Sequence, residues 1–434
     1  MSPELVGIIG LVVLAVLLFS KIWIGAIMVV IALLGYACIG GWESSLVLAG
    51  RVPYSTIADY GLMALPMFIL MGIVVANTGV SGDLFKTAYK WLGQFRGGLA
   101  SASVASCGMF AAICGDSMAT AVTMGKVAIP EMKKYNYDPA LASGSIAAGG
   151  TLGILIPPSL GFILYGLLTQ QSIGKLFMAG IIPGALEIVF YVATIYILCR
   201  FNPRLGPPGP RTSLKEKVVS LKGTWAMLTL FSLVMGGIYM GIFTTTEAGA
   251  IGAFGAIVIS LISRKLTWGN FRASIMETAQ ITGMLVFIIV GAFLLMRFIA
   301  ISNLPTALSE FIAGLAASRY LVLAAFIVFY IIMGCFFDVI AIIILTIPIV
   351  YPVIVGLGFD PIWFGVIMVR VAEIGLVTPP FGLNLFILSQ VTEVPLGTVF
   401  RGVIPFLVAD CLHVILLVAI PALSLYLPYA GKAI

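Results

Sequence analysis

The sequence predicts an all-α polytopic membrane protein, and two observations carry that prediction. Hydrophobic residues make up 61% of the 434 positions and charged residues only 9%, whereas a soluble globular protein carries roughly 25% charged residues. Apolar runs of about 20 residues, each long enough to cross a hydrocarbon core of ~30 Å, recur along the chain. Backbone groups in lipid must bond within the protein, and the alternation of barrel strands is absent, so these runs are predicted to be helices.

Eight uninterrupted spans are predicted. They are residues 5–19, 22–39, 61–76, 176–198, 225–242, 248–262, 281–301 and 403–427. Residues 268–280 are predicted to be interfacial and amphipathic rather than membrane-spanning.

Basic loops orient these spans, because Lys and Arg gather on the cytoplasmic side. The clearest such loop is residues 200–222, which carries six Lys and Arg in a Pro/Gly-rich stretch. Counting membrane crossings back from this cytoplasmic loop places the N-terminus outside, Lys21 inside and residues 42–59 outside.

An internal repeat divides the chain. A gap-free self-match at an offset of 222 positions aligns residues 116–183 with residues 338–405. Both aspartates and all five prolines of the first window fall on aspartates and prolines of the second. The loop charges start the first copy outside and the second inside, so the copies are predicted to be inverted in the membrane. Inverted repeats are typical of secondary transporters, whose sites lie near the bilayer midplane at the repeat interface.

Each copy contains a hydrophobic segment that is interrupted too early for a full span. In the first copy residues 98–132 are broken at Cys114-Gly-Asp-Ser117, and in the second residues 321–355 are broken at Gly334-Cys-Phe-Phe-Asp338. Basic residues flank the first segment at both ends, so we expect it to enter and leave on one side as a re-entrant hairpin. Non-helical backbone at membrane depth is tolerated only where protein or a cavity covers it.

Each copy also contains a helix broken by glycine and a proline pair. These are residues 138–168, with Gly150-Thr-Leu-Gly-Ile-Leu-Ile-Pro-Pro-Ser159, and residues 361–388, with Glu373-Ile-Gly-Leu-Val-Thr-Pro-Pro-Phe-Gly-Leu-Asn384. A proline pair removes two amide donors and breaks the helix before it. The freed carbonyls suit Na⁺, and the restarted half-helix points its positive N-terminal end at an anion.

Residues 1–199 are therefore predicted to form the first repeat, 200–223 a basic cytoplasmic linker and 224–434 the second repeat. Each repeat is expected to have about five spans and one hairpin. Asp138 and Asp360, which precede prolines at span starts, are expected to be helix caps.

The quoted motifs resemble those of the large membrane subunit of TRAP (tripartite ATP-independent periplasmic) transporters, the DctM-like family. The resemblance covers essentially the whole chain. It also rests on Ala64-Leu-Pro-Met-Phe68, Thr244-Thr-Thr-Glu-Ala-Gly249, Phe337-Asp338 and Leu345-Thr-Ile-Pro348. Cys114 and Asp116 stand where the family often has serines.

The resemblance implies an elevator-type fold of the ion-transporter superfamily and a Na⁺-coupled importer in the bacterial inner membrane. It implies two partners: a small four-helix membrane subunit (Q, DctQ-like) and a periplasmic binding protein (P) that delivers a carboxylate. C4-dicarboxylates, sialic acid, 2-oxo acids and sugar acids are all open as substrates.

The predicted sites lie where the tip of each hairpin, the interruption at residues 114–117 or 334–338, meets the broken helix of the same copy. Two or more Na⁺ ions are expected. One is expected between the first tip and residues 150–153, and a second between Asp338 and residues 375–378. The predicted Na⁺ ligands are Gly115, Asp116, Ser117, Thr120, Gly150, Thr151, Gly153, Asp338, Gly375 and Thr378. The predicted substrate residues are Ser159, Pro157, Arg370, Glu373, Pro379 and Asn384.

Single charged residues at membrane depth are expected to be functional, because their burial is costly. Arg370 lies one turn before Glu373, so it is expected either to pair with Glu373 or to meet a substrate carboxylate. Capping of the returning hairpin helix is an alternative role for Asp116 and Asp338. His413, the only histidine, is predicted to be a structural residue.

Several function classes lack support in the sequence. There is no nucleophile elbow, metal-ligand spacing or Walker A motif, so neither an enzyme nor ATP hydrolysis is predicted. The net charge of +6 comes mostly from loop residues and does not indicate nucleic-acid binding. A stand-alone Na⁺/carboxylate symporter of related fold and, less favoured, an ion channel remain the alternatives.

Overall fold

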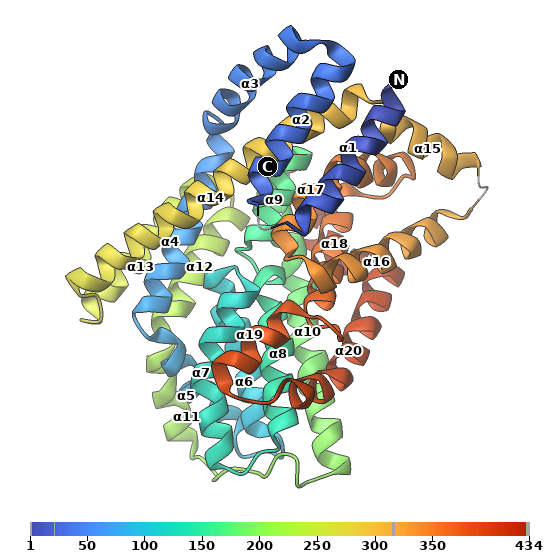
Figure 1. Ribbon diagram of the computed structural model, residues 1–434. Helices are drawn as coiled ribbons and strands as arrows, with labels where there is room; N and C mark the ends of the chain where they lie inside the picture. Colours follow the sequence, from blue (N-terminus) through green and yellow to red (C-terminus); the bar gives the residue numbers. More distant parts are fainter. Residues whose placement is uncertain (1, 21, 315–316, 431–434) are drawn as a thin grey trace.

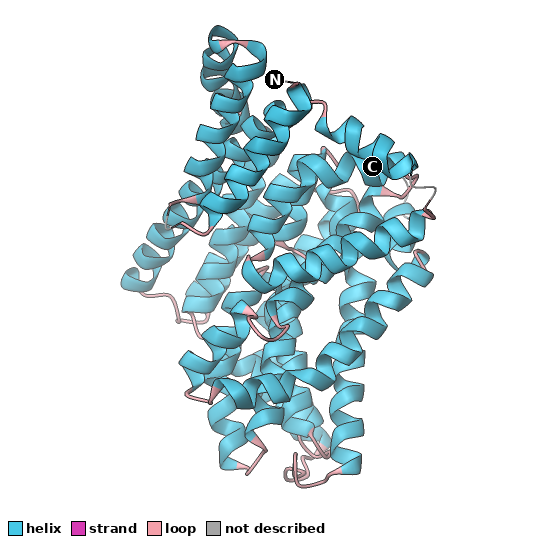
Figure 2. Cartoon of the chain, turned by 45° about the vertical axis from the view of Figure 1, so that its right-hand side comes forward, coloured by secondary structure: helices cyan, strands magenta, loops and turns pink. Residues whose placement is uncertain are grey.

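The computed structural model describes residues 2–20, 22–314 and 317–430. Lys21, which the predicted topology puts on the inside, lies outside the described residues. All regular structure in the described part is helical (Figure 2). Among these residues, eight helices are long and apolar enough to cross a membrane. The prediction of an all-α polytopic membrane protein is confirmed.

Along the chain the helices are α1 (Pro3–Leu18), α2 (Ile24–Gly40), α3 (Trp42–Ile57), η1 (Tyr60–Met63), α4 (Ala64–Asn77), α5 (Val80–Leu92), α6 (Gly98–Cys114), α7 (Ser117–Lys134), α8 (Pro139–Leu155), α9 (Leu160–Thr169), α10 (Ile173–Phe201), α11 (Leu214–Ser220), η2 (Leu221–Gly223), α12 (Trp225–Tyr239), α13 (Thr245–Ile262), α14 (Trp268–Ile301), α15 (Leu304–Gly314), α16 (Arg319–Phe336), α17 (Val339–Gly356), α18 (Pro361–Leu376), α19 (Leu383–Thr392), α20 (Leu396–Ala419) and α21 (Ala422–Ala430).

A peripheral group of helices runs along one flank, with α14 packed on α2, α3 and α4, and α13 on α4 (Figure 1). Small residues bring these helices together. Gly10 of α1 and Gly35 of α2 both lie against the ring of Phe298 on α14, where a Cβ atom would collide with it. The ring therefore fixes the separation of three helices.

The centre of the molecule is the broken helix α8–α9. Both α6 and α7 pack on α8, and α20 packs on it as well. Every residue of α8 from Leu141 to Leu155 is buried. Gly144 of α8 and Gly402 of α20 lie where the two backbones meet, so that a Cβ on Gly402 would collide with the carbonyl of Ala140.

One predicted span is wrong, and the predicted interfacial segment is continuous with its neighbour. Residues 268–280 run without a break into α14, a helix of 34 residues. Such a helix is ~51 Å long at a rise of about 1.5 Å per residue, which exceeds a hydrocarbon core of ~30 Å, so the interfacial position of residues 268–280 stays a prediction. Residues 403–427 are not one span. Helix α20 ends at Ala419 and α21 begins at Ala422, because Pro421 cannot continue a helix.

The contact between α8 and α20 predicts a stability effect. Gly402→Leu should lower the melting temperature of the purified protein, because overpacking a tight contact costs roughly 1–3 kcal/mol or more. The control is Gly397→Leu on the same helix, where nothing lies within 4 Å of the added Cβ. Equal melting temperatures for the two variants in detergent would contradict the close approach of α8 and α20.

Candidate functional site

The turn between α6 and α7 lies against the break between α8 and α9. The amide of Leu160 donates to the carbonyl of Gly115 at 3.2 Å. A Cβ on Gly153 would collide with the carbonyl of Asp116, and one on Gly150 would lie 3.3 Å from the carbonyl of Ser117. Backbone therefore meets backbone, and carbonyl oxygens gather at this contact.

The turn between α16 and α17 lies in the same way against the break between α18 and α19. Gly334 of α16 faces Gly375 of α18, with a Cβ on either residue meeting the backbone of the other. The Sγ of Cys335 donates to the carbonyl of Thr378 at 3.9 Å. Each half of the chain thus supplies one tip packed on one break.

Side chains cap three of the four restarted helices, α7, α9 and α17, whereas α19 starts after Gly382 without a side-chain cap. Oδ1 of Asp116 accepts from the amide of Ala119 at 2.6 Å, and Oδ1 of Asp338 accepts from the amide of Ile340 at 2.6 Å. The Oγ of Ser159 accepts from the amide of Phe162 at 3.3 Å. The capping role left open as an alternative for Asp116 and Asp338 is confirmed, and a carboxylate that caps through one oxygen retains acceptor capacity on the other.

The threonines predicted as ligands use their hydroxyl hydrogens locally. Thr120 donates to the carbonyl of Asp116 at 2.7 Å, and Thr378 donates to the carbonyl of Ile374 at 2.6 Å. A hydroxyl that donates still has lone pairs to offer a cation. Pro157 and Pro379 lie in the breaks themselves, ahead of α9 and α19.

Two predicted substrate residues are buried without partners. Glu373 is 0% exposed and Asn384 is 1% exposed. Within the described residues, neither oxygen of Glu373 and neither polar atom of the Asn384 amide has a hydrogen-bond partner. Buried polar groups in proteins are nearly always hydrogen-bonded, so both side chains mark places where a ligand is expected.

Arg370 is held by two carboxylates, and the pairing predicted with Glu373 is wrong. Its Nη1 lies 2.8 Å from Oε1 of Glu187, as an ion pair outside hydrogen-bond alignment. Its Nη2 donates to Oδ1 of Asp410 at 2.5 Å. All three side chains are 0% exposed. The reason is tertiary: α10 and α20 both pack beside α18.

Three more side chains complete this buried network. The Nε of Arg370 donates to Nδ1 of His413 at 3.3 Å. Tyr191 donates from its hydroxyl to Oε1 of Glu187 at 2.6 Å, and the hydroxyl of Thr151 lies 3.1 Å from the same oxygen. The network therefore joins α8 and α10 of the first half to α18 and α20 of the second.

Glu187 and Asp410 were missed by the sequence analysis. A signal was present, because both are ionisable residues within predicted spans, and such residues are costly unless they face a partner or a cavity. They lie outside the motifs of the repeat, and for that reason the repeat does not single them out. His413 is buried in the network, in agreement with its predicted structural role.

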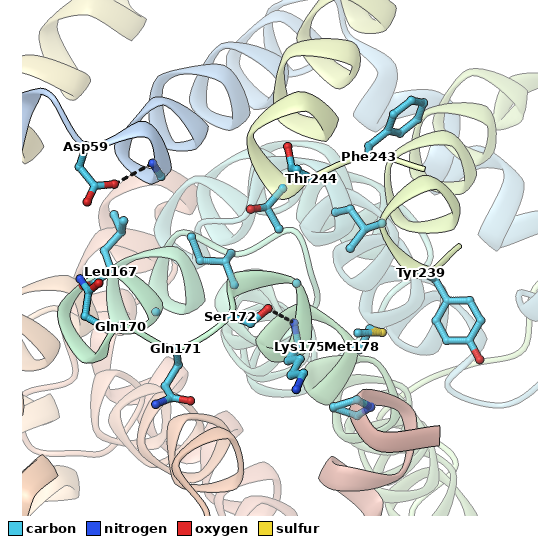
Figure 3. A pocket seen from close by; sticks show the side chains of 17 residues that line it. Asp59, Leu167, Gln170, Gln171, Ser172, Lys175, Met178, Tyr239, Phe243 and Thr244 are labelled. Atoms are coloured by element: carbon cyan, nitrogen blue, oxygen red, sulfur yellow. Dashed lines mark hydrogen bonds between the residues drawn. The ribbon is translucent and has the colours of Figure 1, made fainter. Parts of the chain in front are cut away.

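A separate cavity of about 470 Å³ opens between the α9–α10 turn and the α12–α13 turn. Figure 3 shows Gln170 and Gln171 from the first turn and Lys175 from the start of α10, with Phe243 and Thr244 opposite. None of the predicted Na⁺ or substrate residues lines it. The cavity is therefore distinct from the two tips.

Comparison of the sequence with known protein families identifies the family of this chain. Residues 11–423 match the family model described as "Tripartite ATP-independent periplasmic transporter, DctM component". The chain belongs to the DctM family of TRAP transporter large permeases. The resemblance drawn from the sequence motifs is confirmed.

Individual relatives agree with that assignment. The C4-dicarboxylate TRAP transporter large permease protein DctM of Pseudomonas aeruginosa is 39% identical over 86% of this chain and 88% of its own length. The sialic acid TRAP transporter large permease protein SiaM of Vibrio cholerae is 30% identical over 86% of this chain and 87% of its own length. Among solved structures, the YdaH transporter of Alcanivorax borkumensis has a TM-score of 0.62 at 14% identity, covering 89% of this chain and 90% of that one, which shows the fold alone.

The chain is therefore a transporter permease rather than an enzyme, and a multi-pass inner-membrane protein of a tripartite transporter family. This assignment gives the polar residues in its core a context, since residues of that kind at membrane depth line transport routes.

The Arg370 network predicts a strong stability effect. Arg370→Met should leave two carboxylates buried without a counter-charge, and breaking a buried ion pair from one side costs roughly 3–5 kcal/mol. The unfolding temperature of Arg370→Met should therefore lie far below that of the wild type. The control is Arg401→Met, at an exposed position on α20, which should unfold close to the wild-type temperature.

The triple variant Glu187→Gln, Arg370→Met, Asp410→Asn should recover part of that loss, because no lone charge remains. If Arg370→Met unfolds at the same temperature as the wild type, the network does not hold the halves together.

Proposed function

We propose that this chain is the transport subunit of a Na⁺-coupled, binding-protein-dependent importer of a carboxylate that works by an elevator mechanism. The observation that carries the proposal is the pair of tip–break contacts, one in each half, where backbone carbonyls gather within the protein. Unwound helices of this kind hold ions and substrates in secondary transporters.

The donor set at the tips suits Na⁺. Carbonyl, hydroxyl and carboxylate oxygens are hard ligands, and the described residues place no cluster of three His, Cys, Asp or Glu together that would favour a transition metal. One ion would lie among Gly115, Asp116, Ser117, Thr120 and the α8 positions Gly150, Thr151 and Gly153. A second would lie among Asp338, Gly375 and Thr378.

The substrate carboxylate would lie between the two ions. Helices α9 and α19 start beside it, so their N-terminal ends face an anion favourably. Ser159 begins α9, and the unpartnered Asn384 amide lies in the first turn of α19. Two relatives are named as transporters of C4-dicarboxylates and of sialic acid. Both of these substrates contain a carboxylate group, which supports this substrate class.

The arrangement of helices supports an elevator. The central bundle built on α8–α9 and α18–α19 would be the moving part, and the peripheral group with α2 and α14 the static scaffold. Two inverted repeats would give this bundle its two related tips. The scaffold presents exposed apolar side chains such as Val12, Val16 and Val30, a surface suited to lipid and to the small membrane subunit.

Asp338 tests the second cation site. Asp338→Asn keeps an oxygen for the helix cap, since Asn caps as well as Asp, but removes the charge. It should raise the Na⁺ concentration for half-maximal uptake by roughly tenfold, for a loss of about 1.4 kcal/mol. Uptake is measured in proteoliposomes that contain the whole complex.

The matched control is Asp360→Asn, because Asp360 also caps a helix, through Ile362 and Trp363. It should leave the Na⁺ response unchanged. A wild-type Na⁺ response in Asp338→Asn would place the second ion elsewhere.

A partner requirement separates the importer from a stand-alone symporter. Uptake should need the periplasmic binding protein and the small membrane subunit together, and omission of either should abolish it. Full uptake by this chain alone, driven by a Na⁺ gradient, would favour the symporter instead.

A further inference from the structure

Glu373 stands out among the buried carboxylates of the described residues. It lies on α18 just before the second break, it is 0% exposed, and neither of its oxygens has a hydrogen-bond partner. The other buried carboxylates, Glu187 and Asp410, are both paired with Arg370. An isolated carboxylate in a low-dielectric interior is costly unless it binds a proton or a positive charge compensates it.

The nearest cation in sequence cannot supply that compensation. Arg370 lies one turn earlier on the same helix, but its guanidinium is held by Glu187 and Asp410. Those two carboxylates already outnumber its single charge. The core around α18 therefore has an excess of negative charge before Glu373 is counted.

Arg370 acts on Glu373 only through space, and the groups nearest to Glu373 at the first tip add oxygen. The hydroxyl of Ser117, at the start of α7, lies near its carboxylate without reaching hydrogen-bond geometry. Asp116, next to Ser117 at the first tip, is close enough to add a further negative potential. Ser117 is 3% exposed, so water offers little screening there.

We propose that Glu373 is a ligand of a third cation site, for Na⁺, formed with Ser117 where the first tip meets the second broken helix. This inference rests on the proposed Na⁺ coupling and reassigns Glu373 from substrate to cation. A carboxylate substrate would be repelled by an unpaired carboxylate, whereas a hard monovalent cation satisfies both the charge and the oxygen donors.

The position of this site gives it a specific role. The two cation sites proposed at the tips each use one half of the chain, whereas Glu373 belongs to the second half and Ser117 to the first. A cation between them draws the first tip toward α18. Occupancy of this site therefore couples the two halves, and the charge of the ion offsets Glu373 beside the incoming substrate.

The test counts ions. The complex with its binding protein and small subunit is reconstituted in proteoliposomes, and ²²Na⁺ and substrate uptake are measured together. Glu373→Gln keeps the side chain's size but removes its charge. It should carry one Na⁺ fewer per substrate and show a lower Hill coefficient for Na⁺. Its KM for loaded binding protein at saturating Na⁺ should stay within about twofold of wild type, because uniform substrate binding is untouched.

The matched control is Glu393→Gln, at an exposed position at the end of α19. It should transport with the wild-type ion count. If Glu373→Gln does not yield folded protein, Glu373→Asp decides. The melting temperature of the purified complex is measured as Na⁺ replaces choline at constant ionic strength. The shorter carboxylate of Glu373→Asp should raise the Na⁺ concentration that gives half of the maximal increase in melting temperature.

Each other result overturns part of the account. An unchanged ion count in Glu373→Gln, or an unchanged Na⁺ midpoint in Glu373→Asp, contradicts the third site alone. A raised KM with a full ion count makes Glu373 a substrate ligand. Wild-type uptake that ignores Na⁺ contradicts the proposed coupling as a whole, and the third site with it.

Discussion

The guanidinium of Arg370 is the constraint on which the centre of this molecule depends. It bridges Glu187 on α10 and Asp410 on α20, and all three groups are fully buried. Such an arrangement is stable only while every partner is present, because a lone charge in this interior would be very costly. Thr151 extends the contact to α8 through Glu187. The two halves of the chain are thus tied together beside both breaks.

This bridge also decides which groups remain free to meet a ligand. With Arg370 occupied, the half-helix N-termini of α9 and α19 and the Asn384 amide are left to attract an anion. Glu373 is left without a counter-ion and faces the first tip. The proposed division between substrate and cation residues therefore depends on one buried ion pair and not on the residue types alone.

Glycine sets the geometry of the tips themselves. Gly153 and Gly375 allow backbone to lie directly on backbone, and a Cβ at either position would collide with the opposing tip. Contacts of this kind present carbonyl oxygens, which do not depend on side-chain identity. Cys114 and Asp116, at positions where the resemblance implies serines, thus leave the backbone carbonyl oxygens of Gly115 and Ser117 in place.

Local chemistry made part of this arrangement predictable. The proline pairs and their glycines indicate where α8 and α18 end, and Asp138 and Asp360 cap the helices that they precede. The partners of Arg370 were not predictable, because residues 187 and 410 are distant in sequence and meet it only through helix packing. The continuity of residues 268–280 with the rest of α14 was not predicted, although no proline separates the two parts. The ion and substrate assignments remain predictions.

The decisive measurement is a structure of the assembled complex, determined by electron cryomicroscopy with Na⁺ and a bound carboxylate substrate. Arg370 should stay between Glu187 and Asp410 in it, while the substrate lies against the starts of α9 and α19. A guanidinium released from both carboxylates and bound to the substrate would contradict it.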